Sequence, residues 1–417
     1  MRPGPARAGA DGARVMVYLP VPLGRIALGR TLPVDIRAPD GRLLLRRGQA
    51  LQSEAHRDML ATHHACMTET DAQAWQKALE RRMRTLRLNG ADMTAIAQEP
   101  MPGEILDTDY LEGRAIDGGW LDLQEILRGL LYQGAQAVTP LPRLEGIEHK
   151  TLALLAQDPD EALFVLFQAL PDLGLGYCAT HALLSGVVAA LTADKLTQLP
   201  EHRCVLLRSA LVMNIGMARP QDSLARQLKA PSPAQRSIIS GHPPTSADIL
   251  RGFGVQDTEL LNMVHWHHAP EQNPDIATQQ LQLNLLHLAD TLVAKMAPRV
   301  SRPAMSALDA AKSLLQEATA ATQQQRVAMA SVLGFYPPGT YVQLANGEVA
   351  VVMARGDKAS APHVASLLNT KGMPLSPYLY RDTRHADFAV RRPLAASQVL
   401  VRINAERIRH LRLQHGV

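Results

Sequence analysis

Residues 279–296 have the sequence QQLQLNLLHLADTLVAKM, and the spacing of their apolar side chains decides the fold class. Leu281, Leu285, Leu288 and Leu292 recur at intervals of three and four residues. An α-helix completes a turn in about 3.6 residues, so side chains spaced in this way lie on one face and can be buried against other helices. The stretch therefore predicts a helix packed in a helical core.

Similar apolar spacing recurs on both sides of this stretch. It predicts further helices over residues 121–132, 146–157, 159–169, 180–193, 202–213, 232–252, 258–268 and 304–334. Aromatic residues make up only 4% of the chain and hydrophobic residues 46%, so the core must consist mainly of aliphatic side chains, which favours helices. We expect one all-α domain over residues 116–334.

The part of the chain before this domain carries strand signals. Residues 34–37 and 42–46 flank an Asp40-Gly41 pair, a sequence that is typical of a tight β-hairpin turn. We expect a disordered tail at residues 1–14, a small β-rich module at 15–71, and a connecting helix and linker at 72–115.

The part of the chain after the helical domain also carries strand signals. Tyr336-Pro337-Pro338-Gly339 ends the helical pattern, and Asn346-Gly347 separates two β-rich runs. We expect residues 335–417 to form a β-rich extension with a basic tail. The predicted fold class is thus multidomain and mainly α, with a central all-α helical bundle flanked by a small N-terminal β module and a small C-terminal β appendage.

Composition and charge limit the classes of function. The net charge of +4 comes mainly from dispersed arginines, and the run Arg81-Arg82-Met83-Arg84 is typical of a solvated helix face, so we do not expect nucleic acid as a partner. No apolar run approaches the roughly 20 residues of a transmembrane helix, and the three cysteines lack disulfide or metal-site spacing. We expect a cytoplasmic protein without membrane association.

Histidines are concentrated in the helical domain. Residues three apart on a helix share a face, so we expect His265 near His268 and His287 near Asp290. Histidine is the commonest metal ligand, which raises a metal-dependent hydrolytic site as a hypothesis. A single histidine on an apolar face is more often a core or cap residue. Only the pattern of the histidines as a whole can therefore indicate a metal site. Seven of the fifteen histidines lie between residues 181 and 287: His181, His202, His242, His265, His267, His268 and His287.

The helical domain contains an ordered series of motifs. They are His181, Met213-Asn214-Ile215-Gly216-Met217, Gly241-His242-Pro243, His265-Trp266-His267-His268 and Leu288-Ala289-Asp290. This order resembles that of the HD-GYP family of HD-domain phosphohydrolases, with an early His, a His-Asp-x-Gly-Lys block, a His-Pro, a His-His-Glu leading to Gly-Tyr-Pro, and a late Ala-Asp. The resemblance implies an HD-domain bundle and hydrolysis of cyclic di-GMP with two or three metal ions, commonly iron or manganese.

Several positions depart from the family pattern. Met213 and Asn214 stand where the resemblance implies His and Asp, Met217 stands at the Lys, Ala269 stands at the Glu, and Gly-Tyr-Pro is absent. A neutral Asn is a poor bridge between two cations, and Met is a soft ligand that suits copper(I) rather than iron or manganese. The candidate ligands of any residual transition metal are the retained residues His181, His242, His267, His268 and Asp290.

These departures leave two hypotheses open. In the first, which we favour, the chain is a degenerate, catalytically inactive HD-GYP-type protein that acts as a regulatory or interaction module in bacterial cyclic di-GMP signalling, with a signalling protein or cyclic di-GMP as its partner. In the second, it is an active metal-dependent phosphohydrolase that uses the retained ligands. The second requires those five side chains to converge within coordination reach, with an open cleft leading to them.

Overall fold

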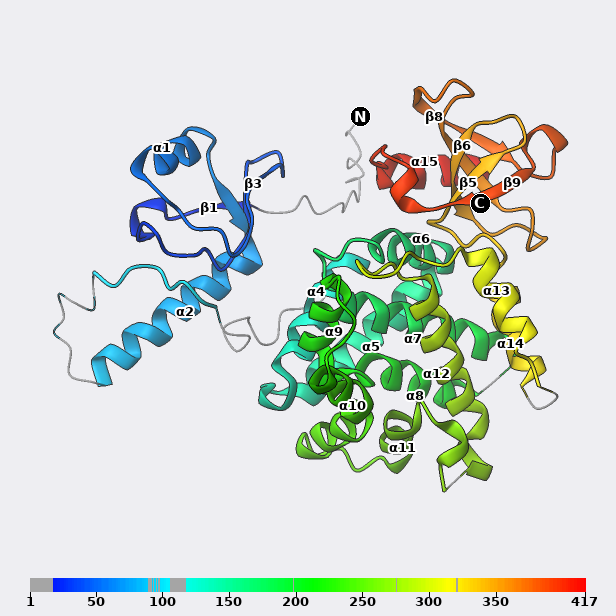
Figure 1. Ribbon diagram of the computed structural model, residues 1–417, viewed down its shortest axis with the longest axis horizontal. Coiled ribbons are helices and arrows are strands. Elements are labelled where there is room, and N and C mark those ends of the chain that lie inside the picture. Colours follow the sequence, from blue (N-terminus) through cyan, green and yellow to red (C-terminus); the bar gives the residue numbers. More distant parts are fainter. Residues whose placement is uncertain are drawn as a thin grey trace, which may run out of the picture. The chain divides into compact units, whose positions relative to one another are not determined.

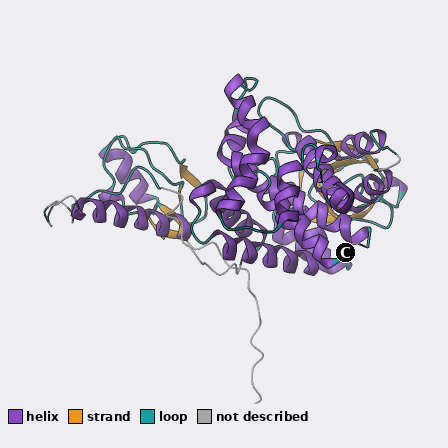
Figure 2. Cartoon of the chain, turned by 90° about the horizontal axis from the view of Figure 1, so that it is seen from below, coloured by secondary structure: helices purple, strands orange, loops and turns teal. Residues whose placement is uncertain are grey.

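The computed structural model describes residues 18–88, 92, 94, 96, 98–105, 118–197, 199–274, 276–319 and 322–417. The chain forms two compact units, Met1–Ala115 and Ile116–Val417, which are described separately. The tail predicted at residues 1–14 lies outside the described residues. Among the described residues, the strands lie in one small sheet in each unit, and helices form most of the second unit (Figure 2).

The N-terminal unit contains a four-stranded antiparallel sheet in the order β1-β4-β2-β3. The strands are β1 (Tyr18–Pro20), β2 (Ile36–Arg37), β3 (Leu43–Leu45) and β4 (Cys66–Thr68), accompanied by helices α1 (Glu54–Thr62) and α2 (Glu69–Leu88). Strands β2 and β3 pair across the turn that contains Asp40 and Gly41, which confirms the predicted hairpin.

Helix α2 belongs to the core of the N-terminal unit. Its side chains Ala74, Trp75, Ala78 and Leu79 are at most 1% exposed and pack with the sheet residues. The indole Nε1 of Trp75 donates a hydrogen bond to the carbonyl of Pro102 at 2.7 Å, which ties the following segment to the helix. The helix predicted only as a connector therefore buries one apolar face, because its small and aromatic residues recur at helical spacing.

The second unit is a bundle built around helix α7 (Figure 1). Every residue of α7 from Tyr177 to Ala190 is buried, so this helix is covered on all sides. It packs against α8, α12 and α14, as expected for a helix that is apolar all round. The helices are α4 (Trp120–Gln133), α5 (Pro140–Gln157), α6 (Pro159–Ala169), α7 (Tyr177–Lys195), α8 (Pro200–Val212), α9 (Ala218–Arg226), α10 (Pro233–Gly252), α11 (Thr258–Trp266), α12 (Ile276–Met296), α13 (Ala307–Gln316) and α14 (Gln323–Leu333).

The helices differ from the predictions in several places. The range 304–334 contains two helices, α13 and α14, instead of one. Helix α9 was not predicted at all, and its short sequence is mostly polar. Helix α11 ends at Trp266, two residues before the predicted end, so His267 and His268 lie beyond it.

The C-terminal part of the second unit is a five-stranded antiparallel sheet in the order β8-β7-β6-β5-β9. Strands β5 and β6 pair around Asn346 and Gly347, and Gly347 has a φ of +91°, as the predicted hairpin turn requires. The basic tail is a helix, α15 (Ala405–His415), that packs on the sheet. The strands are β5 (Tyr341–Leu344), β6 (Val349–Ala354), β7 (His363–Leu368), β8 (Pro374–Asp382) and β9 (Val390–Leu394).

This sheet is joined to the start of helix α6 by ion pairs and close packing. Arg412 of α15 is only 6% exposed and pairs with Asp158 at 2.9 Å and Glu161 at 3.2 Å. Gly339 lies so close to Phe164 that a Cβ at residue 339 would stand 2.5 Å from the Phe164 carbonyl oxygen. The sheet and the bundle therefore share one packed interface.

None of the helices within the described residues combines the length and apolarity that a bilayer span requires.

Candidate metal centre

The five retained candidate ligands come from four places in the bundle. His181 lies on α7, His242 on α10 and Asp290 on α12, while His267 and His268 follow the end of α11. All except His268 are buried, and the His268 side chain is 46% exposed. The group therefore reaches from the core to the protein surface.

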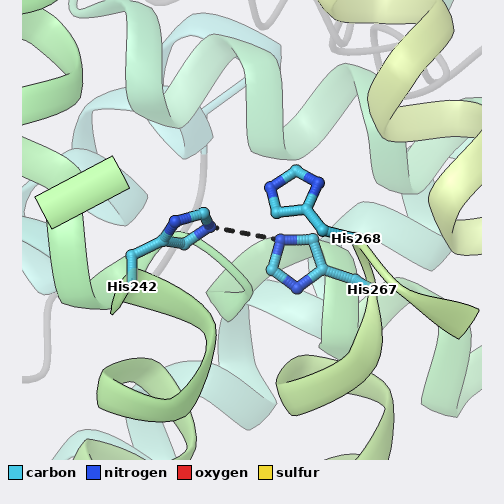
Figure 3. A group of neighbouring side chains, drawn as sticks. All are labelled: His242, His267 and His268. Carbon is cyan, nitrogen blue, oxygen red and sulfur yellow. Dashed lines mark hydrogen bonds between the residues drawn. The ribbon is translucent and has the colours of Figure 1, made fainter. Parts of the chain in front are cut away.

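Three of these residues, His242, His267 and His268, form a cluster that we call the histidine trio. One ring nitrogen from each lies within 4.8 Å of the others. The Nε2 atoms of His242 and His267 are 3.3 Å apart, and Figure 3 shows these two rings pointing toward each other with the His268 ring beside them. The trio thus gathers three nitrogen ligands from two separate chain segments.

Backbone carbonyls fix the tautomers of the two buried rings. The Nδ1 atom of His242 lies 2.6 Å from the carbonyl oxygen of Ile239, and Nδ1 of His267 lies 2.8 Å from that of Val264. A carbonyl oxygen can only accept, so each Nδ1 carries the proton and each Nε2 of a neutral ring presents a lone pair. The two Nε2 atoms that face each other are thereby left as acceptors.

The two buried rings are neutral near pH 7. Burial lowers the pKa of His242 to about 4, and burial together with the nearby His268 lowers the pKa of His267 to about 3. No proton is then present to join the two lone pairs at 3.3 Å. Two opposed lone pairs repel each other unless a cation or a donor lies between them, so the arrangement fits a metal ion.

The spacing of the two Nε2 atoms also fits a metal site. Two nitrogens bound at about 2.1 Å to one tetrahedral ion lie about 3.4 Å apart, close to the 3.3 Å found between His242 and His267. A nitrogen of His268 up to 4.8 Å away would have to close by up to about 1.4 Å to match that geometry. An exposed side chain can make such a movement by a small rotation.

His181 and Asp290 bind each other. The Nε2 atom of His181 lies 2.7 Å from Oδ1 of Asp290, and the hydroxyl of Tyr177 lies 3.4 Å from Nδ1 of His181. Burial alone would raise the pKa of Asp290, but the hydrogen bond and charge of His181 hold it well below its ordinary range. The second oxygen of Asp290 is 3.7 Å from Nδ1 of His268, so the ionised carboxylate links the pair to the trio.

The segment that departs from the family pattern is mostly buried, and the buried amide of Asn214 is its unusual feature. Met213 is fully buried, Met217 is 7% exposed and Asn214 is 2% exposed. Among the residues that the structure describes, neither Oδ1 nor Nδ2 of Asn214 has a hydrogen-bond partner. The Gly216 N–H donates to Ser246 Oγ at 3.0 Å, which fixes this segment against α10.

Of the two predictions about neighbouring histidines, the one that His287 lies near Asp290 stays a prediction, although both residues lie on α12. The prediction that His265 lies near His268 on one helix face is wrong, because α11 ends at Trp266 and the His265 ring contacts Trp266 instead. His287 has a role that the sequence did not reveal: its Nδ1 lies 2.7 Å from the His267 carbonyl oxygen and anchors the trio's backbone. Ala269 caps a short 3₁₀ turn at Pro270–Gln272.

Other supporting groups were also missed by sequence reasoning. The carbonyls of Ile239 and Val264 carry no signal in the sequence, since every residue has one. Tyr177 did have a signal, because it stands four residues before His181 and shares its helix face.

Comparison with known proteins gave limited findings. No family model matches the chain, and no curated protein matches it. Among solved structures the chain is similar to Bd1817, an HDG"Y"P protein from Bdellovibrio bacteriovorus, at a TM-score of 0.39 and 14% sequence identity, covering 75% of this chain and 98% of that chain.

Proposed function

We propose that this chain is a regulatory protein of the HD-GYP type that holds a single transition-metal ion in the histidine trio and does not hydrolyse cyclic di-GMP. The order of its motifs supports the assignment to the HD-GYP type. The opposed Nε2 atoms of His242 and His267 support the proposal that a cation binds there. Imidazole nitrogens suit iron, zinc, copper and nickel. A bound ion would supply Lewis acidity and could lower the pKa of a bound water.

One observation supports the loss of catalysis most strongly. Asn214 is buried, and its side chain has no hydrogen-bond partner among the described residues. In the family this position holds the Asp that bridges two metals. A bridging carboxylate brings negative charge between two dications and lowers their repulsion, whereas a neutral amide cannot. Without a second metal, the attacking and leaving oxygens of a phosphodiester have no pair of cations to stabilise them.

The neighbouring groups support the same conclusion. Asp290 is held by His181 at 2.7 Å, so one of its oxygens is already used. Its other oxygen lies 3.7 Å from Nδ1 of His268, beyond hydrogen-bond distance, so its negative charge acts on that ring through space. Direct metal binding by His181 and Asp290 stays a prediction.

A signalling protein or cyclic di-GMP is the partner that the proposal implies. The test measures binding and turnover of cyclic di-GMP on one anaerobic preparation of the full chain, with iron, manganese or zinc supplied. We expect no turnover above the metal-only blank. Turnover that His242→Ala abolishes and His265→Ala retains would overturn the proposal, because it would assign catalysis to the trio.

The second candidate function is a metal-dependent phosphohydrolase of altered chemistry. One observation favours it: the five retained residues are connected through the His181–Asp290 contact, the Asp290–His268 approach and the trio. The exposed His268 would meet the substrate. In that case linear dinucleotides or phosphate monoesters should be hydrolysed with the bound metal, and removal of the metal by a chelator should stop the reaction.

A further inference from the structure

Helix α12 holds the backbone of the histidine trio through the side chain of His287. The Nδ1 atom of His287 lies 2.7 Å from the carbonyl oxygen of His267. A carbonyl oxygen can only accept, so this Nδ1 carries a proton and donates it. His267 directly follows Trp266, the last residue of α11, and a helix end leaves such carbonyls without a partner inside the helix. The hydrogen bond from α12 therefore fixes a peptide that α11 itself does not fix.

The ring of His267 is held from another element than its backbone. Its Nδ1 lies 2.8 Å from the carbonyl oxygen of Val264 on α11. Helix α12 packs against α11 and holds the His267 carbonyl through His287. The same helix carries Asp290, whose Oδ2 lies 3.7 Å from Nδ1 of His268. Helix α12 thus approaches both consecutive histidines of the trio, one at its backbone and the other at its ring.

We infer that His287 is a positioning residue for the metal ion of the trio, an inference that rests on the proposed metal site. The ligands of such a site must be held within about 0.5 Å of the binding geometry by supporting hydrogen bonds. The Nε2 atoms of His242 and His267 already stand 3.3 Å apart, close to the spacing that one ion requires. His287 lies outside the motifs of the family pattern, so its contribution belongs to this chain's own residues.

Loss of the His287 hydrogen bond would act on the ion through His267. The peptide that follows α11 could then rotate, and the Nε2 atom of His267 would move away from that of His242. An ion would have to order this peptide again when it binds. We therefore expect weaker binding and an altered ligand geometry, although neither His287 nitrogen contacts the ion.

Titration of the chelator-treated full chain with Co²⁺ tests the inference, because the visible absorption of bound Co²⁺ reports the geometry of its ligands. His287→Leu keeps a side chain of comparable size but removes the donor. It should weaken Co²⁺ binding about tenfold or more and change the absorption spectrum. In His287→Asn the amide Nδ2 is two bonds from Cβ, as Nδ1 is in histidine. This variant should therefore restore most of the affinity and the wild-type spectrum.

The matched control is Thr151→Val, which removes another side-chain hydrogen bond to a backbone carbonyl. Thr151 is fully buried on α5, and its Oγ1 donates to the carbonyl of Ile147 at 2.7 Å. Helix α5 carries none of the candidate ligands. Urea unfolding of the ion-free proteins should show a loss of stability in Thr151→Val, while its Co²⁺ affinity and spectrum should stay those of the wild type.

The inference is overturned if His287→Leu binds Co²⁺ with the affinity and spectrum of the wild type, if His287→Asn behaves like His287→Leu, or if Thr151→Val loses as much affinity. If His287→Leu does not fold, His287→Gln replaces it, because its amide stands one bond further from Cβ than that of Asn. Equal affinities of the Gln and Asn variants would then overturn the inference. A wild-type protein that binds no Co²⁺ would instead overturn the proposed metal site, and this inference with it.

Discussion

Replacing Asn214 by Ala should stabilise the protein. The side chain is 2% exposed, and neither of its polar atoms has a hydrogen-bond partner among the described residues. An unsatisfied buried polar group costs about 1–3 kcal/mol. Removing the amide leaves a cavity of about 30 Å³, the share of one water molecule in the liquid, which costs about 0.7 kcal/mol. The free energy of unfolding should therefore rise by about 0.3–2.3 kcal/mol.

Urea unfolding of the full chain in a chelator, followed by circular dichroism, measures this change. The contrasting variant is Asn404→Ala, because Asn404 caps helix α15 and accepts from the backbone N–H of Arg407 at 3.0 Å. Loss of that cap should destabilise the protein by about 0.5–2 kcal/mol. A loss of 1 kcal/mol or more in Asn214→Ala would refute the reasoning, since it would mean that the amide has a partner in solution.

Two further predictions concern the C-terminal sheet. Gly339→Ala should destabilise the junction between the sheet and α6 by about 3 kcal/mol or more. The new Cβ would stand 2.5 Å from the Phe164 carbonyl oxygen, and residue 339 has a φ of +89°. An unchanged thermal midpoint would contradict this prediction. The hydrogen bond from Arg381 lowers the pKa of Glu348, so the carboxylate stabilises the fold above the ordinary pKa of Glu, and this contribution is lost as the pH falls through the lowered pKa. Urea midpoints measured from pH 7 to pH 3 should therefore fall less steeply in Glu348→Gln, and equal slopes would contradict the prediction.

Local signals in the sequence predicted the parts of the fold that depend on local geometry. The Asn346-Gly347 hairpin was predicted because its turn needs a residue with positive φ between two β-rich runs. Helix α12 was predicted from its leucine spacing. The missed helices include α1, α9 and α15. Helices α9 and α15 are mostly polar and lack such spacing, and their buried residues meet partners distant in the sequence, as Asp222 meets Tyr132 and Arg412 meets Asp158.

The candidate site was only partly predictable for the same reason. The order of the motifs indicated which histidines to group. Helical spacing, however, placed His265 beside His268, because α11 was expected to run two residues further. The tautomers of His242 and His267 depend on backbone carbonyls, and the pairing of His181 with Asp290 depends on how α7 packs on α12. Such contacts arise from tertiary packing, which spacing along the chain does not specify.

Metal stoichiometry is the most direct test of a single metal site in the histidine trio. Full chain purified without oxygen and dialysed against iron, manganese or zinc should contain about one tightly bound ion per chain. His242→Ala and His267→Ala should each lose it, while His265→Ala, which alters a histidine that contacts Trp266 outside the trio, should retain it. Two ions per chain, or a wild-type protein that binds none, would contradict the account.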